Sequence, residues 1–526
     1  MALFRIGTHL ALLTALSAAL AAFIVPERNI VHVPLGTSAA ELNVRIAAAP
    51  AGTTFRLAPG THTFRDTVRV RRGHVTLAGP TAGRGARIVF DTASGNGLEV
   101  RGERPVLRGR LHADAVAGAR WVKLAAGHGF RPGDAIYMQQ RNTRAWLDAH
   151  GWTNIAMEAA DRRPFRESMH VVAAVDGSRV RLDTPLAYAL EAGTASFHSV
   201  ALLEGVRLEA LTVTWALGRA DPYDFSNPYP AFTRSHAVLV SGTRGAVVRD
   251  MAVHDTPSTA FTLHASIHAN VENLTVARAH NKAGGGNGYG VQLSEAFHNR
   301  LTRLHITGMR HGFILSAWNA EVGNVVEIDR IDRDVNLHGS PDHSNTIRVR
   351  EAVLDYGATG RNWMLLAPGA RNHALTDFAA NDITFARAVA DRHGRKRRHD
   401  ILRAADGGAF LYGGRGDDRL VGGRGADTIV GGPDRDVMTG GAGADTFVIH
   451  ADPNGAADVR DRITDFEAGD RLVLPAAGPV TVRRTLAGMV VEAGGAAVLL
   501  EGVDRLDPDA VLRDADGRWS PEGLGV

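Results

Sequence analysis

The stretch YGGRGDDRLVGGRGADTIVGGPDRDVMTGGAGADTF, from Tyr412 to Phe447, places a glycine pair at every ninth residue. Each of its four repeats follows Gly-Gly-x-Gly-x-Asp-x-apolar-x, although the third has Asp434 where glycine is expected. Glycine permits the left-handed backbone angles of tight turns, and aspartate supplies the hard oxygen ligands that Ca²⁺ prefers. We therefore expect a calcium-dependent fold whose ligand positions are Gly413, Gly416, Asp418, Gly422, Gly425, Asp427, Gly431, Asp434, Asp436, Gly440, Gly443 and Asp445.

This nine-residue period resembles the calcium-binding repeat of RTX (hemolysin-type) proteins. The resemblance implies a parallel β-roll over residues 404–448, with Ca²⁺ between successive turns. The tail, residues 449–526, resembles the C-terminal β cap and secretion signal of secreted bacterial enzymes. RTX proteins usually leave the cell through type I secretion machinery, so the resemblance implies an extracellular protein.

The N-terminus suggests a different export route. Residues 1–25 carry one arginine and then an apolar run that is shorter than the roughly 20 residues needed to span a bilayer. This pattern predicts a secretory signal peptide or an anchor. No other stretch is apolar enough for a stable membrane span. The chain has 0 cysteines, which excludes disulfides, thiolate metal sites and cysteine nucleophiles.

The middle of the chain repeats with a longer period. Five similar segments begin at Ala237, Ala260, Gly290, Gly312 and Asp334, each with alternating apolar residues. A repeat of this length with short strands predicts an all-β fold, a right-handed parallel β-helix over residues 30–390. A short amphipathic helix is expected at 38–48, and the period weakens in an excursion at about 111–190. A β-sandwich and a leucine-rich repeat fit less well, because their strand spacing and consensus are absent.

Charge divides the chain unevenly. Residues 401–526 hold 13 Arg and 21 Asp plus Glu, a balance of −8, so the net charge of +3 leaves +11 for residues 1–400. A basic body attracts acidic polymers. We expect an acidic polysaccharide rather than a nucleic acid as the partner. The run RHGRKRRH falls in a predicted basic linker, residues 391–403.

Alternation within the five segments predicts which side chains face outward. One outward column contains Thr262, Gln292 and Asn336, and the next contains Ser241, His264, Ser294, Ser316 and His338. Histidine moves protons near neutral pH, so a histidine-rich face is a candidate active site. The predicted catalytic residues are His311, His338, Arg310, Tyr289, Lys282 and Asp334. The predicted substrate-binding residues are His264, Gln292, Asn336, Arg333 and His343.

This body resembles the pectate-lyase-like β-helix superfamily, which includes mannuronan epimerases and polysaccharide lyases. The resemblance implies proton abstraction from C5 of a uronic acid, with Arg310, Arg333 or Lys282 neutralising the carboxylate. His311 or His338 would be the base and Tyr289 the acid. The epimerases carry an Asp-Pro-His motif, whereas this chain has Pro341-Asp342-His343.

Two other functions fit the same pattern. A glycoside hydrolase needs two carboxylates that flank the bond, and Asp334 and Asp342 are the candidates. A calcium-stabilised adhesin or surface protein needs no catalysis at all.

Overall fold

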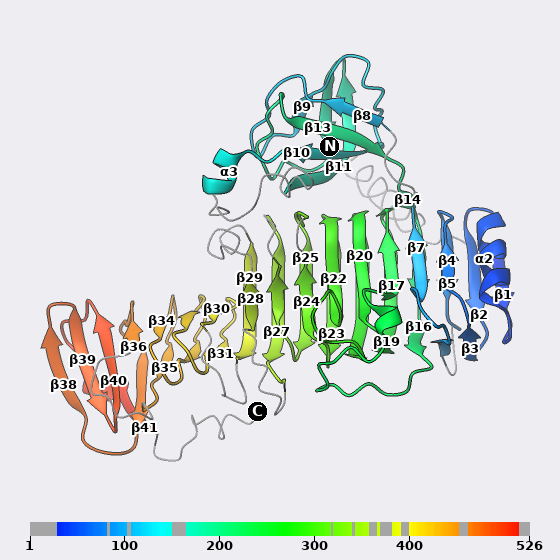
Figure 1. The fold of residues 1–526 in the computed structure, drawn as a ribbon. Coiled ribbons are helices and arrows are strands. Elements are labelled where there is room, and N and C mark those ends of the chain that lie inside the picture. Colours follow the sequence, from blue (N-terminus) through cyan, green and yellow to red (C-terminus); the bar gives the residue numbers. More distant parts are fainter. Residues whose placement is uncertain are drawn as a thin grey trace, which may run out of the picture.

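The computed structural model describes residues 29–80, 85–102, 107–149, 165–316, 319–338, 342–356, 365–368, 381–390, 399–451 and 461–514. The expected signal peptide or anchor lies outside these ranges. Within them the chain is nearly all β and forms a right-handed parallel β-helix followed by a parallel β-roll. Figure 1 shows one elongated solenoid, with a smaller domain standing over its middle. No helix in the described ranges is long and apolar enough to cross a membrane.

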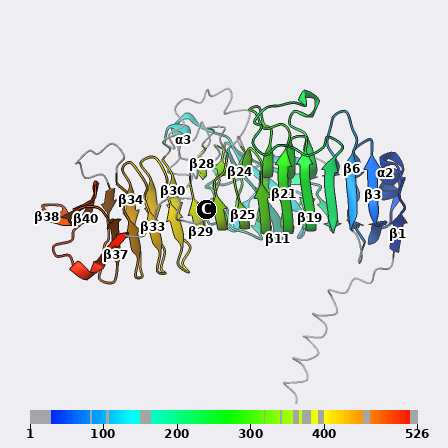
Figure 2. The same ribbon diagram turned by 90° about the horizontal axis from the view of Figure 1, so that it is seen from below.

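The longest sheet, called sheet A here, runs through both parts of the solenoid (Figure 2). Near the N-terminus it divides into two branches that rejoin at β19. The first branch is β1 (Asn29–Val33), β2 (Thr53–Leu57), β5 (Val75–Ala78) and β15 (Arg207–Glu209), and the second is β3 (Gly60–Phe64), β6 (Ala86–Phe90) and β16 (Leu211–Trp215). The sheet continues through β19 (Val247–Thr256), β21 (Asn270–Ala279), β23 (Arg300–Thr307), β25 (Val325–Ile331), β27 (Thr346–Val353) and β29 (Asp382–Val389).

Sheet B forms another face of the β-helix and contains the predicted repeat. Its strands are β4 (Val68–Val70), β7 (Leu98–Arg101), β17 (His236–Ser241), β20 (Thr259–Ile267), β22 (Tyr289–Phe297), β24 (His311–Leu315), β26 (Val335–Leu337) and β28 (Leu366–Pro368), beside the short pair β14 (Leu203–Glu204) and β18 (Thr243–Arg244). Val238, Phe261, Val291, Phe313 and Val335 pair in register along it. The predicted alignment of the five segments is thereby confirmed.

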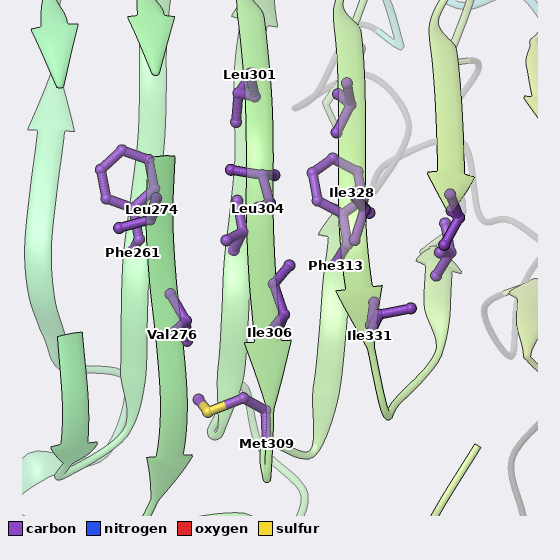
Figure 3. Close-up of a cluster of buried hydrophobic side chains, with 14 of the residues drawn as sticks. Phe261, Leu274, Val276, Leu301, Leu304, Ile306, Met309, Phe313, Ile328 and Ile331 are labelled. Atoms are coloured by element: carbon purple, nitrogen blue, oxygen red, sulfur yellow. The ribbon is translucent and has the colours of Figure 1, made fainter. Parts of the chain in front are cut away.

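Apolar side chains from both sheets meet inside each coil. Figure 3 shows Phe261 and Phe313 of sheet B close to Leu274, Leu304 and Ile328 of sheet A. All five are at most 1% exposed. Burying a side chain of this size stabilises the fold by roughly 1.5–3 kcal/mol, and the same contact repeats in successive coils. Because the contact repeats, alternating apolar residues are enough to form the core of the β-helix.

A ladder of buried asparagines fixes how the coils stack. The backbone N–H groups of Asn299, Asn324 and Asn345 each donate to the Oδ1 atom of the asparagine in the next coil, at 3.1, 2.9 and 3.0 Å. The last acceptor is Asn381. These bonds satisfy turn amides that would otherwise be buried without partners, so they hold neighbouring coils in one register.

A helix closes the N-terminal end of the solenoid. Helix α2 (Ala39–Ala48) begins after Ser38, whose Oγ accepts the backbone N–H of Glu41 at 3.1 Å, a typical N-cap. Its Leu42 and Ile46 side chains are buried against the first coil. A solenoid needs such a cap because its first coil has no neighbour on one side.

The β-roll continues the same solenoid without a break. Sheet A extends from β29 into β31 (Phe410–Tyr412), β33 (Thr428–Val430), β35 (Thr446–Val448), β37 (Arg471–Pro475) and β41 (Val511–Asp514). The opposite sheet contains β30 (Ile401–Arg403), β32 (Arg419–Val421), β34 (Val437–Thr439), β36 (Asp461–Ile463), β40 (Ala496–Glu501), β39 (Gly488–Ala493) and β38 (Thr481–Thr485). Residues 401–403 of the expected linker therefore form a strand, while 391–398 lie outside the described ranges.

The excursion is a small antiparallel domain, called the insert here. Its strands are β8 (Leu107–Arg110), β9 (Trp121–Lys123), β10 (Ala135–Gln140), β11 (Arg166–Asp176), β12 (Arg179–Leu182) and β13 (Ala195–Val200), with the short helix α3 (Arg144–Ala149). It has a hydrophobic core of its own, which includes Val122, Ile136 and Phe197. A second cluster, with Tyr137 and Met169 against Phe297 and Val322, packs the insert onto the β-helix.

Candidate functional site

The outward face of sheet B carries a ladder of polar side chains that bond to one another. His236 Nδ1 lies 2.7 Å from Thr262 Oγ1, which donates to Gln292 Oε1 at 3.2 Å. Gln292 Nε2 in turn donates to Ser316 Oγ at 2.8 Å. Burial lowers the pKa of His236 to about 4, so this imidazole is neutral at pH 7. The ladder runs from β17 across β20 and β22 to Ser316, directly after β24, and its members hold each other in fixed orientations.

His311 is held at the start of β24 by a carboxylate from the next coil. Its Nδ1 atom lies 2.6 Å from Asp334 Oδ2, and the two residues are 2% and 0% exposed. Asp334 Oδ1 accepts the backbone N–H of Gly312 at 3.2 Å, and its Oδ2 also accepts Asn336 Nδ2 at 3.1 Å. A carboxylate beside Nδ1 places the imidazole proton there, which leaves Nε2 as the basic nitrogen.

A tyrosine and a second histidine stand beside His311. The ring centroid of Tyr289 is 5.5 Å from that of His311, and the ring of His338 is 6.4 Å away on the other side. Burial raises the pKa of Tyr289, partly offset by Arg310 and Arg234. Tyr289 therefore keeps its proton at neutral pH and can donate it. The structure thus brings together Tyr289, His311, Asp334, Asn336 and His338.

Local backbone geometry explains why Tyr289 and His311 share a face with the predicted columns. A Cβ added at Gly312 would lie 2.6 Å from Ile331 Cδ1, so this position faces the core, as does the next residue, Phe313. Two successive core positions shift the alternation, and His311 then lies on the outward side, where Asn336 Nδ2 is 3.3 Å from its Nδ1. Simple alternation from Phe313 would have pointed His311 inward.

Two of the three predicted cations have structural roles instead. Lys282 is 0% exposed, and its Nζ donates to the carbonyl oxygens of Asp221 and Ala279 at 2.7 and 2.5 Å. Burial lowers its pKa to about 8. Arg333 is also 0% exposed and donates to the backbone carbonyls of Met309, Asp332, Pro222 and Asp355. Both side chains therefore hold neighbouring loops through backbone carbonyls.

Arg310, His264 and His343 remain near the surface. Arg310 is half-buried, and its Nη1 donates to the Ala283 carbonyl at 3.2 Å. His264 Nδ1 lies 3.0 Å from Ser241 Oγ, so it belongs to the predicted outward column. His343 contacts Ser344 Oγ at 2.6 Å and packs edge-on against Tyr188 of the insert, at 5.4 Å between ring centroids. Burial lowers the pKa of His343.

The carboxylates expected for a hydrolase are both held inside the protein. Asp334 is bonded to His311, as described above. Asp342 is 1% exposed, and its Oδ1 accepts the backbone N–H of Glu321 at 3.2 Å. Pro341, from the same motif, lies outside the described ranges. These two aspartates have separate structural partners and do not form an exposed pair.

Sequence reasoning missed a group of acids where the insert meets sheet B. Glu167 comes from β11, Glu295 from β22 and Glu321 from the following coil. Strand β11 packs against β22, and Glu321 Oε1 accepts the backbone N–H of Glu295 at 3.0 Å. Burial, and then the charge of Glu295, raise the pKa of Glu167, and burial with Asp342 raises that of Glu321. Glu167 lies in the polar segment beyond residue 142, which has no repeat to align. No local signal in the sequence links it to residues more than 100 positions away.

A cavity of about 410 Å³ lies elsewhere, between the insert and the solenoid. It is lined by residues such as Phe130, Asp134 and Arg244, and by none of the predicted site residues. Arg244 there bonds to Glu204 at 2.6 Å and to the Gly133 carbonyl. These contacts tie the insert to the solenoid.

The predicted calcium ligands stack in two columns along the β-roll. The N–H groups of Asp418 and Asp427 donate at 2.8 Å to the Oδ1 atoms of Asp436 and Asp445, eighteen residues later. The structure extends these columns to three aspartates outside the four repeats, namely Asp400, Asp461 and Asp470. The nine-residue spacing identified the aspartates inside the repeats, whereas only the stacking of the coils reveals the three outside them.

Several features of the roll fit Ca²⁺. Within the described residues, the Oδ2 atoms of Asp436 and Asp445 are buried without a hydrogen-bond partner. Burial, with Asp461 and Asp418, raises the pKa of Asp436, and burial is the main cause that raises the pKa of Asp445 to about 6. A Cβ at Gly422 would lie 1.9 Å from the Gly440 carbonyl oxygen, so only glycine allows these turns to approach. A cation would neutralise these stacked carboxylates.

Backbone carbonyls must supply part of any such site. No group of three Asp, Glu or His side chains in the described ranges is arranged to hold a metal ion. Asp434 adopts a left-handed φ of +95°, so it takes the backbone shape of the glycine it replaces. Gly416 and Gly443, at the corresponding positions of two other repeats, also have left-handed φ values, +131° and +141°.

Comparisons with known proteins identify one segment of the chain. The model of the RTX calcium-binding nonapeptide repeat matches residues 412–447 in four copies, so this segment consists of RTX repeats. No curated protein sequence matches the chain.

Solved structures similar to the chain include the tailspike gp61 of Pseudomonas phage phi297 (13% identity, TM-score 0.43) and the tailspike gp54 of Acinetobacter baumannii bacteriophage AP22, solved with a capsular saccharide (9%, 0.41). Each match covers 83% of this chain but only 66% and 65% of the tailspikes, just under two thirds. The family 28 exopolygalacturonase of Yersinia enterocolitica is also similar (9% identity, TM-score 0.24, covering 85% of this chain and 78% of that enzyme).

Proposed function

We propose that this protein is an extracellular enzyme that modifies an acidic polysaccharide by removing the proton on C5 of a uronic acid. The observation that carries this proposal is the buried hydrogen bond between His311 and Asp334, beside Tyr289 on the outward face of sheet B. A histidine oriented by a carboxylate and placed next to a proton donor is suited to general acid–base catalysis.

The reaction divides into two steps. His311 Nε2 takes the C5 proton, and the electron pair moves into the adjacent carboxylate group as an enolate. In a lyase, this pair then forms the C4–C5 double bond while the C4–O4 bond breaks, and Tyr289 donates its proton to the leaving oxygen. In an epimerase, a proton returns to C5 from the opposite face, and no bond of the polymer breaks.

The developing charge on the uronate needs a positive partner. Lys282 and Arg333 are committed to backbone carbonyls, so we assign this role to Arg310, which is half-buried. It lies close enough to Tyr289 to lower the pKa of that hydroxyl, which supports a position beside the reacting sugar.

The RTX segment supports an extracellular location. The turns of this segment bring carboxylates together, and the Ca²⁺ that would neutralise them is plentiful outside cells. Export by type I secretion machinery or by the N-terminal segment is part of this proposal. When bound, Ca²⁺ would neutralise Asp436 and Asp445 and hold the roll together. It takes no part in the proton transfer.

Product analysis on a panel of acidic polysaccharides tests the proposal. A lyase raises ultraviolet absorbance through its unsaturated product, whereas an epimerase changes the uronate composition without that rise. A hydrolase releases reducing ends alone. Absence of all three activities with calcium present would favour a non-catalytic adhesin, and unchanged activity of His311→Ala would remove this residue from the mechanism.

A further inference from the structure

Three histidines meet where the insert packs on the turns of the β-helix. His268 and His298 occupy corresponding turns of successive coils, directly after β20 and β22, and both have left-handed φ values, +56° and +53°. His170 comes from β11 of the insert and is 0% exposed. The ring centroid of His298 is 6.2 Å from that of His268 and 5.9 Å from that of His170. The ring of His298 therefore neighbours one histidine of the solenoid and one of the insert.

The three rings differ in their partners. His268 Nε2 lies 3.2 Å from Asp183 Oδ2 of the insert, so an acid faces this ring. The two ring nitrogens of His170 lie 2.7 and 2.9 Å from side-chain hydroxyl oxygens of the insert. His298 Nε2 is buried and has no hydrogen-bond partner among the described residues. A carboxylate therefore compensates a positive charge on His268, whereas a proton added to His298 meets no such partner in the described part of the chain.

His298 lies beside the apolar contact that holds the insert in place. It follows Phe297 in the chain, and its backbone N–H donates to the carbonyl oxygen of Val322 at 2.8 Å. Phe297 and Val322 are the solenoid side chains that pack against Tyr137 and Met169 of the insert. A buried imidazolium at this place loses its hydration without gaining a counter-ion. Protonation of His298 therefore weakens the docked position of the insert.

The pKa shifts of the cluster agree with this geometry. Burial, and then the charge of His268, lower the pKa of His298 to about 4, and burial with the other two rings lowers the pKa of His170 to about 3. The other charged groups that face the cluster are Asp183, which raises the pKa of His268 and His298, and Arg244 of β18, which lowers that of His268. An undocked histidine has an ordinary pKa of 6.5, so the docked state binds fewer protons. The contribution of these rings to docking is complete above pH 6.5 and is lost as the pH falls toward 4.

The insert can leave the solenoid as an intact unit. Its own hydrophobic core, which includes Val122, Ile136 and Phe197, is separate from the core inside the solenoid. The apolar cluster that joins the two parts is much smaller than either core. Contacts of this size open at a lower free energy than the cores unfold, so acid should separate the insert from the solenoid before it unfolds either part.

We infer that His170, His268 and His298 form an acid-sensitive latch, which holds the insert on the β-helix at neutral pH and releases it when the cluster becomes protonated. His298 is the trigger, because the added proton finds no acceptor among the described residues. Asp183 opposes release, because it pairs with protonated His268. The insert stands over the middle of the solenoid (Figure 1), so its release exposes the apolar surface that it covers there. The latch does not depend on the uronate chemistry proposed above.

Distances between two spin labels test the latch, because a chain with 0 cysteines takes up labels only where cysteines are introduced. Val116→Cys in the insert and Val44→Cys on α2 replace side chains that are 71% and 70% exposed. Double electron–electron resonance with calcium present should give one narrow distance distribution at pH 7. A second, broad distribution should grow as the pH falls from 6.5 toward 4, while the far-ultraviolet circular dichroism stays unchanged.

Three variants of the labelled protein separate the latch from general acid denaturation. His298→Asn removes the titrating ring and keeps a residue that tolerates a left-handed φ, so the midpoint of release should fall by about one pH unit. Asp183→Asn removes the counter-charge of His268 and should raise the midpoint. His305→Asn is the matched control and should leave the midpoint unchanged, because His305 lies on β23 of sheet A, 3.4 Å from Asp329, with its side chain 43% exposed.

Three results would overturn the latch. The first is a narrow distance distribution that persists at pH 4 in the otherwise unchanged labelled protein. The second is the same midpoint with and without His298→Asn, or an equal shift in His305→Asn. The third is a loss of circular dichroism with the same midpoint, since the whole protein would then unfold and the insert would have no separate release.

Discussion

His311 and Asp334 come from successive coils and meet only because β24 and β26 pair in register. The carboxylate of Asp334 fixes both the ring orientation of His311 and the position of the imidazole proton. In the proposed mechanism, Asp334 is therefore a positioning residue that acts through His311. The distinction matters for mutagenesis, because the two substitutions should differ in their effect on pH dependence.

Asp334→Asn should lower kcat by about 10²–10⁴-fold, the usual contribution of a correctly oriented general base. The amide keeps the size of the carboxylate but can place the proton on the wrong imidazole nitrogen. Rates measured from pH 5 to 9 should show a displaced acidic limb for Asp334→Asn, because a general base acts in its unprotonated form, while His311→Ala shows no such limb at all. Unfolding temperatures of both variants control for misfolding, and an unaltered pH profile of Asp334→Asn would contradict the positioning role.

Glu167 makes the junction of the insert sensitive to pH. Its pKa is about 8 in the folded protein and 4.5 for an ordinary glutamate, so the folded state holds this proton more tightly. The contribution of Glu167 to the free energy of unfolding is complete below pH 4.5 and is lost as the pH rises toward 8. The facing groups are Glu295, Glu321 and Tyr137.

Differential scanning calorimetry from pH 5 to 9 can measure this loss. The Tm of wild type should fall relative to that of Glu167→Gln across the range, because glutamine does not titrate. Parallel Tm curves for the two proteins would show that Glu167 has an ordinary pKa.

Neighbouring strands of sheet B place apolar side chains at corresponding inward positions. A substitution at one such position therefore tests how the whole core is packed. Phe313 is 0% exposed and lies between Val291 and Val335 of the neighbouring strands. Phe313→Ala should reduce the free energy of unfolding by about 3–5 kcal/mol in denaturant titrations, since it leaves a cavity that the rigid coils cannot fill. Val44→Ala, at a 70% exposed position on α2, should change it by less than about 0.5 kcal/mol. Similar losses for the two variants would mean that the stack adapts to the cavity.

The turns of the β-roll depend on paired columns of aspartates. Asp436→Asn should reduce the number of calcium ions bound per chain, because Asp436 is 0% exposed and its Oδ2 has no other partner among the described residues. Equilibrium dialysis with calcium measures the stoichiometry. Asp417→Asn, an exposed neighbour of Asp418, is the matched control and should bind as many ions as wild type. An unchanged count in Asp436→Asn would exclude this residue as a ligand.

At the scale of the whole molecule, the β-helix and the β-roll share one sheet. Strand β29 pairs with β31, and the backbone N–H of Leu365, next to β28, donates to Asp400 Oδ1 at 2.8 Å. Removal of calcium should therefore loosen the last coils of the β-helix as well as the roll, because a solenoid transmits stability between neighbouring coils.

Hydrogen exchange with and without a calcium chelator tests this coupling. Protection should fall in β31–β37 and also in β27 and β29, while β2 and β5, at the far end, keep theirs. Loss confined to the roll would show that the two parts fold independently.

The sequence alone determined the architecture of this protein. A nine-residue period with aspartate and apolar residues in phase predicted the calcium roll, and segments 22 to 30 residues apart predicted the coils, their register and the polar columns at Gln292 and His264. Such periods can be recognised in the sequence because every coil buries apolar side chains at corresponding positions.

Only the tertiary structure decided which polar residues can act. It placed Lys282 and Arg333 against backbone carbonyls, paired His311 with Asp334, and packed β11 of the insert, which carries Glu167, against β22, which carries Glu295. These arrangements depend on burial and on contacts between segments that are distant in the sequence. Such contacts do not recur with a period, so the sequence alone does not predict them.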